Sequence, residues 1–107
     1  MDYLLVHCSF PSDIEARQIG TEVVRRQLAA CVSLCPAVTS IYRWKGEIEE
    51  AAEVLAVFKT TRAGFSALET AIRELHPYEV PEIVGVPIAE GSEGYLRWID
   101  EQTREGA

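Results

Sequence analysis

Disulfide chemistry and the common catalytic motifs are missing from this chain of 107 residues. Its three cysteines are an odd number and form no Cys-x-x-Cys pair, so we expect reduced thiols and no disulfide framework. Neither Gly-rich phosphate-binding motif occurs, nor does Gly-x-Ser-x-Gly or His-Glu-x-x-His. Only two histidines are present, which limits acid–base schemes. The sequence therefore indicates no standard class of enzyme.

Basic residues and long apolar runs are also scarce. Ten Lys and Arg stand against 17 Asp and Glu, which gives a net charge of −7 and argues against nucleic acid and anionic membrane surfaces as partners. No run approaches the roughly 20 apolar residues that a membrane span needs. The chain starts Met1-Asp2-Tyr3, with an acid where a secretory signal carries bases, so we expect a cytoplasmic protein.

The residues that are present form an ordinary globular composition. Hydrophobic residues make up 48% and charged residues 25% of the chain. A chain of this length buries a working core without a disulfide or a structural metal. We therefore expect a single domain over 1–107 that needs no cofactor to fold.

Hydrophobic patterning predicts four strands and three helices. Apolar runs or β-like patterns predict strands, and apolar residues at three-to-four spacing predict helices. The strands are expected at 3–8, 31–42, 48–60 and 83–87, and the helices after Ser12, over 65–75 and after Ser92. The order β-α-β-β-α-β plus a last helix predicts an α+β, ferredoxin-like fold: an antiparallel sheet with two helices on one face.

Two features of this arrangement predict a homo-oligomer. The second face of the sheet has no helices to cover it, and the middle hairpin is longer than its partner strands. Uncovered strand edges are most simply covered by further copies of the chain. We expect seven residues to be buried in the core: Leu5, Val6, Ile19, Val23, Val57, Phe58 and Leu68.

Local signals refine the hairpin. Pro36 predicts an edge strand or a bulge, because proline cannot donate to a sheet. Residues 44–47 predict a turn with a glycine. The acids Glu47, Glu49, Glu50 and Glu53 indicate a solvated strand edge.

No two neighbouring residues make a metal chelate. Cys31 and Cys35 would lie about 13 Å apart on one strand, and His7 and Cys8 would point to opposite faces. A copper or zinc site would need ligands from separate segments or subunits, such as Cys8 with His76. The alternative is that all three cysteines are small buried hydrophobes.

Further candidates lie in a proline-flanked loop and along the hairpin. The stretch His76-Pro77-Tyr78-Glu79-Val80-Pro81-Glu82 holds an imidazole, a phenol and carboxylates on a rigid loop. Such a loop suits ligand binding, or it is a turn in which His76 and Tyr78 cap the helix. Lys59 either reaches solvent or pairs with Glu82 in a cleft.

Five blocks in order resemble one known family. They are residues 28–33, 40–49, 59–61, 76–83 and 91–99, which include Cys31, Trp44-Lys45-Gly46, Lys59-Thr60-Thr61 and the His76-Pro77-Tyr78 stretch. Together they resemble the divalent-cation tolerance proteins of the CutA family. The resemblance implies a ferredoxin-like subunit in a cytoplasmic homotrimer linked to tolerance of copper or another divalent metal, with no known reaction.

The resemblance also implies site residues. Cys8 matches a first-strand cysteine proposed as a copper ligand in some members, and His76 matches the histidine of the family's His-Pro-Tyr block. We expect both as metal ligands, although Leu75 stands where some members have a second histidine. The positions implied to line clefts between subunits, where a metal ion or a small ligand would bind, are Tyr42, Trp44, Lys59, His76, Tyr78 and Glu82. Two alternatives stay open: a signalling adaptor similar to PII proteins, and an enzyme that uses His76, Lys59 and Glu82 on a small anion.

Overall fold

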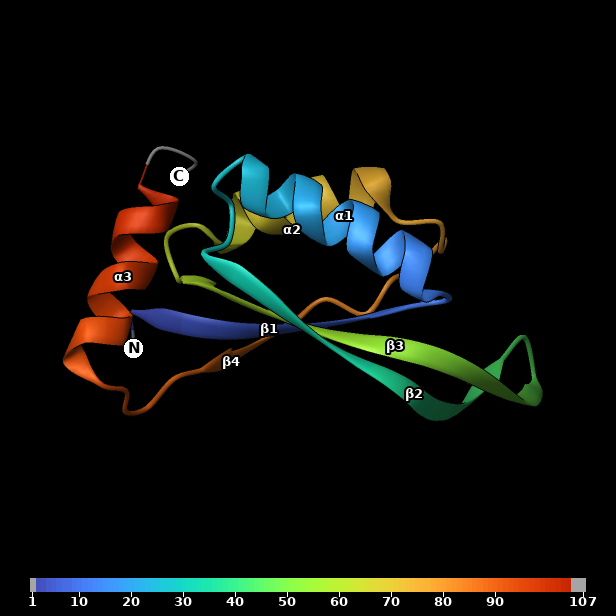
Figure 1. Cartoon of the computed structure of the whole chain (residues 1–107). Coiled ribbons are helices and arrows are strands. Elements are labelled where there is room, and N and C mark those ends of the chain that lie inside the picture. The colour runs from blue at the N-terminus through green and yellow to red at the C-terminus, as the bar shows by residue number, and fades with distance from the viewer. Residues whose placement is uncertain (1, 105–107) are drawn as a thin grey trace.

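Among the described residues, four strands and two helices form two layers, and a third helix lies at one end of the sheet (Figure 1). The computed structural model describes residues 2–104. The sheet has the order β2-β3-β1-β4, with every neighbouring pair antiparallel. The ferredoxin-like prediction is therefore confirmed. The elements are β1 (Tyr3–Phe10), α1 (Asp13–Arg25), β2 (Cys31–Trp44), β3 (Glu47–Thr61), α2 (Phe65–Leu75), β4 (Val84–Pro87) and α3 (Glu93–Thr103).

The core lies between the sheet and the helices α1 and α2. Along β1 every second side chain is buried, because successive residues of a strand point to opposite faces. Val6 and Phe10 from β1 meet Phe58 from β3 and Leu68 from α2, and all four are fully buried. The seven-residue core prediction is correct for Val6, Ile19, Val23, Phe58 and Leu68.

Leu5 and Val57 are not in this core, so their predicted burial there is wrong. Both are only half-buried, since they alternate with Val6 and Phe58 and lie on the opposite, helix-free face of the sheet. We call this surface the open face. Its apolar members are Leu5, Leu55, Val57, Val84 and Val86.

The second and third strands continue well beyond the rest of the sheet. The last pair between β1 and β3 is Phe10 with Val54, and further out β2 and β3 pair only with each other. We call residues 38–53 the arm (Figure 1). Its base is a bulge between Cys35 and Val38, as Pro36 predicted, and Ala37 there has a φ of 63°. The chain measures 44 × 25 × 22 Å, and the predicted long hairpin is confirmed.

The ends of the helices follow from local chemistry. Ser12 Oγ accepts a hydrogen bond from the Glu15 amide at 3.3 Å and donates to Glu15 Oε1 at 3.0 Å, which caps α1. Helix α2 ends at Leu75, because Pro77 keeps His76 out of the helical conformation. Ser92 occupies the N-cap position of α3 but makes no side-chain capping bond.

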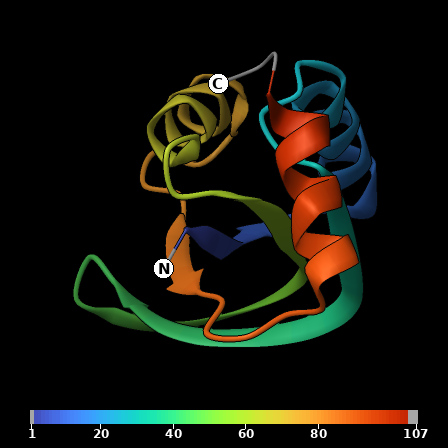
Figure 2. The same ribbon diagram turned by 90° about the vertical axis from the view of Figure 1, so that its left-hand side faces the viewer.

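Helix α3 lies at the end of the sheet opposite the arm (Figures 1 and 2). The Tyr3 hydroxyl donates to the Asp100 carboxylate, and Cys31 Sγ lies 3.6 Å from the Tyr95 hydroxyl. These contacts attach α3 to β1 and β2 and leave most of the open face bare. No helix within residues 2–104 is long and apolar enough to cross a membrane.

Candidate functional site

The loop between α2 and β4 is fixed to the sheet through the side chain of His76. The imidazole Nε2 lies 2.8 Å from the Ser9 carbonyl oxygen, and Nδ1 accepts the Tyr78 amide at 3.1 Å. The ring also stacks on Phe10, with centroids 4.6 Å apart. His76 is thus a buried cap that joins the end of α2 to β1, as one of the two sequence interpretations expected.

These contacts assign the protonation state of His76. Because Nδ1 accepts a backbone amide and Nε2 donates to a carbonyl, the imidazole is neutral. Burial lowers the pKa of His76, although the Ser9 carbonyl and the acids Glu15 and Glu53 partly oppose that shift. A metal ion would have to displace one of the two hydrogen bonds in order to bind this ring.

Glu53 is a central residue of this region, although no sequence pattern indicated it as a site residue. It was expected on a solvated strand edge, but its side chain is only 7% exposed, because the loop covers it, and its Oε2 accepts the Tyr78 hydroxyl. Burial and this carboxylate raise the pKa of Tyr78, which therefore stays a neutral phenol. The sequence feature that could have indicated its burial is its position next to the apolar run Val54–Phe58.

The predicted metal ligand Cys8 lies on the core side of β1 and is fully buried. Burial, followed by the charges of Glu82 and Glu53, raises the pKa of its thiol to about 12. The thiol is therefore protonated at neutral pH, and a metal ion would have to displace its proton. The expectation that all three cysteines are buried is wrong for Cys35, which is exposed, and Cys31 is half-buried.

Lys59 and Glu82 do not meet in a single chain. Lys59 lies on β3 opposite Leu5, and its Nζ donates to Ser33 Oγ on β2. His76 contacts Ser9, which is four residues further along β1, or about 13 Å at 3.3 Å per residue. No salt bridge within residues 2–104 involves Lys59 or Glu82, so one chain does not assemble the acid–base set that the enzyme alternative needs.

Tyr42 and Trp44 lie on the arm. Both rings are exposed, and they stand opposite Glu49 and Glu47 in the hairpin register. The Lys45 ammonium lies 5.8 Å from the Trp44 ring centre, a cation–π contact. The charge of Tyr42 contributes to the raised pKa of Tyr78, so this part of the arm is within electrostatic reach of the loop.

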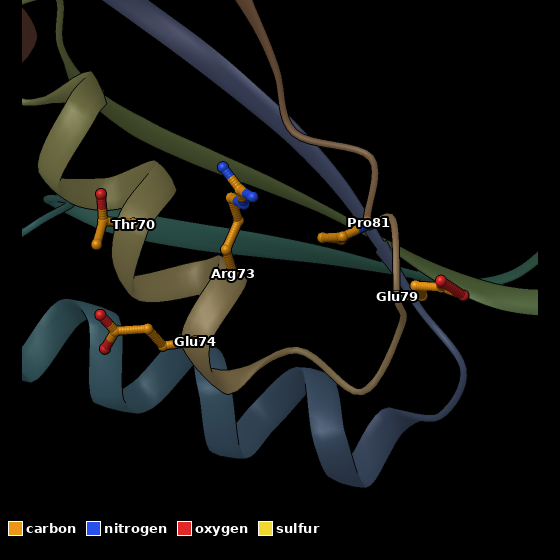
Figure 3. Close-up of a pocket in the computed structure, with 5 residues that line it drawn as sticks. All are labelled: Thr70, Arg73, Glu74, Glu79 and Pro81. Carbon is orange, nitrogen blue, oxygen red and sulfur yellow. The ribbon is translucent and has the colours of Figure 1, made fainter.

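Two surface hollows lie beside α2, away from the predicted residues. One hollow of about 320 Å³ lies between α2 and the loop and is lined by Thr70, Arg73, Glu74, Glu79 and Pro81 (Figure 3). A second, of about 510 Å³, lies beside α2 near Arg26 and Ala67. Neither includes a predicted site residue. In the part of the chain that the structure describes, no group of three His, Cys, Asp or Glu side chains is placed to hold a metal ion.

These features define the class of protein: a ferredoxin-like α+β subunit with an extended arm and a bare sheet face. The family profile described as "CutA1 divalent ion tolerance protein" matches residues 4–102. The chain belongs to this family, as the sequence resemblance predicted.

Known members of this family match the chain over nearly its whole length. A divalent-cation tolerance protein CutA from Thermus thermophilus is 48% identical over 99 residues, which are 92% of this chain and 96% of that protein. A solved structure of a Thermus thermophilus divalent cation tolerance protein superposes with a TM-score of 0.92 and covers 94% of this chain and 98% of its own. A structure named as the periplasmic divalent cation tolerance protein CutA from Archaeoglobus fulgidus is 33% identical, with a TM-score of 0.92 and coverage of 94% and 98%.

Some animal relatives are longer than this chain. The human Protein CutA is 45% identical over 93 residues, which are 87% of this chain and 52% of that protein. The chain thus spans about half the length of that relative.

Proposed function

We propose that this protein acts in divalent-cation tolerance as a homotrimer that binds copper, another divalent metal or a small ligand in clefts between subunits. The observation that carries the proposal is the exposed apolar surface of the open face. Val84 and Val86 are 50% and 40% exposed. Val86 pairs with Leu5, whereas His7 of β1 lies between Val84 and Val57. An exposed, largely apolar face of this kind is typical of a protein–protein interface.

The arm supports the same proposal. Ile41 and Ile48 are 68% and 66% exposed, and β2 offers an unpaired edge along the whole arm. A second chain can cover both the apolar side chains and the edge. A closed assembly of identical subunits satisfies every copy equally, whereas an open one leads to filaments.

Assembly would also bring together the predicted site residues, which lie apart in a single chain. Lys59 lies on the open face of one chain, whereas His76, Tyr78 and Glu82 lie on the loop beyond the other end of β1. A cleft between two copies brings different parts of the sheet together, which one chain does not do. We place this assembly in the cytoplasm, because the free thiols of Cys8, Cys31 and Cys35 suit a reducing compartment.

Calorimetric titration with Cu(I), under anaerobic conditions and against a competing chelator, tests the ligand. Cys8→Ser should weaken binding at least tenfold, and Cys35→Ser is the matched control because that exposed thiol is not a predicted ligand. Equal affinity of the Cys8→Ser variant and the wild type would remove Cys8 from the site.

Light scattering tests the assembly separately. At micromolar concentration the wild type should show about three times the chain mass of 11.9 kDa. A mass of 11.9 kDa under these conditions would contradict both the trimer and the clefts that depend on it.

A further inference from the structure

The hydrogen bond between Glu53 and Tyr78 attaches the base of the arm to the loop between α2 and β4. Beyond the pair Phe10–Val54 the hairpin has lost β1 as a neighbour, and the bulge at Cys35–Val38 interrupts its register with β2. Bulges bend a strand and change its twist. The hydrogen bonds of the sheet therefore define the direction of the arm only weakly at this point. Glu53 is the first residue of β3 past β1, and it pairs with Val38 just after the bulge.

A chain of contacts leads from this residue back to the sheet. Glu53 accepts the Tyr78 hydroxyl, the Tyr78 amide donates to His76 Nδ1, and His76 Nε2 donates to the Ser9 carbonyl. The two rings lie 4.8 Å apart, and His76 stacks on Phe10. The loop is thereby held at β1 by its imidazole and at the arm by its phenol.

We propose that Glu53 is a positioning residue that, through Tyr78, fixes the arm relative to the 76–83 loop. A bond between a phenol and a carboxylate is stronger than one between neutral groups, and here it is partly shielded from water because Glu53 is buried. The bond keeps the arm, which carries Tyr42, at a fixed position relative to Tyr78, so that both halves of the proposed cleft keep one geometry. This last consequence rests on the proposed function, whereas the attachment of the arm does not.

Hydrogen–deuterium exchange of the amides in 39–52 tests the attachment. Glu53→Ala and Tyr78→Phe should each speed this exchange about tenfold, as loss of one charge-assisted hydrogen bond predicts. The double variant should exchange no faster than either single variant, because both remove the same bond. Glu53→Gln, whose amide oxygen still accepts a hydrogen bond, should stay within about threefold of wild type.

Two variants serve as matched controls. Tyr3→Phe removes another phenol–carboxylate bond, at the far end of the molecule, and Glu50→Gln neutralises an exposed acid on the arm itself. Neither should change exchange in 39–52. The inference is overturned if Tyr78→Phe leaves exchange unchanged, if the two single effects add, or if Glu53→Gln behaves like Glu53→Ala. It is also overturned if exchange rises equally across the whole chain, since that reports global destabilisation.

Light scattering on the same samples separates this inference from the proposed function. A trimer whose arm is unaffected by these variants would refute the attachment and leave the trimer in place. A single chain whose arm is loosened by Tyr78→Phe would support the attachment and refute the trimer.

Discussion

At the scale of single residues, the main chemical result is that His76 and Cys8 are held in neutral forms. Both nitrogens of His76 bind backbone groups, and the buried thiol of Cys8 has a pKa of about 12. Neutral, desolvated groups of this kind are suited to holding a loop against a core. Any metal binding at these residues would have to compete with contacts that already stabilise the fold.

The lowered pKa of His76 predicts how stability depends on pH. The unfolded chain binds a proton at this residue more readily than the folded chain, so stability decreases as the pH falls below the ordinary histidine value of 6.5. Above that value both states are neutral and the contribution is constant. Urea unfolding between about pH 5 and 8 should therefore show that the free energy of unfolding falls more steeply toward acidic pH for wild type than for His76→Gln. Equal slopes would contradict the assignment.

At the scale of elements, the cap of α1 is a measurable contribution to stability. Ser12 Oγ accepts the Glu15 amide, a group that has no partner within the helix. Ser12→Ala should lower the free energy of unfolding by about 1 kcal/mol in denaturant titration. Ser92→Ala is the control, because Ser92 makes no side-chain capping bond, and it should change stability by less than about 0.5 kcal/mol.

The turn at the tip of the arm depends on its glycine. Lys45 and Gly46 have φ values of 50° and 84°, which a two-residue hairpin turn requires. Gly46→Ala should lower the thermal midpoint, because alanine adopts this conformation at a cost of about 1 kcal/mol. Gly94→Ala, in helix α3 with open space around the added methyl group, should raise the midpoint or leave it unchanged. The reverse order would contradict this account of the turn.

At the scale of the whole molecule, substitutions at two adjacent residues of β3 test folding and assembly separately. Phe58 is fully buried in the core, and Phe58→Ala should cost about 3–5 kcal/mol of stability. Val57 lies on the open face, so Val57→Asp should abolish the trimer in light scattering and preserve the far-ultraviolet circular dichroism spectrum. A trimeric Val57→Asp variant would show that the open face is not the interface.

Assembly also predicts a concentration dependence. If the native state is a trimer and the unfolded chain is not, the thermal midpoint of the wild type rises with protein concentration. Calorimetry between about 5 and 500 μM measures this shift. A constant midpoint over that range would count against coupled folding and assembly.

The sequence by itself determined the local and periodic features of this protein. Alternating and helical patterns predicted the order of the elements, and five motif blocks predicted the family. Pro36 predicted an edge strand or a bulge in β2, and Pro77 predicted the end of α2. These features depend on interactions between near neighbours, which the order of residues encodes directly.

Only the tertiary structure decided which face each side chain occupies and what it meets there. Leu5 and Val57 look as apolar as Val6 and Phe58, yet the helices α1 and α2 cover only the face of the sheet that holds Val6 and Phe58. Glu53 looks like its acidic neighbours Glu49 and Glu50, yet the loop 25 residues later covers it and supplies Tyr78. Contacts between distant segments create such environments, and no local pattern specifies them.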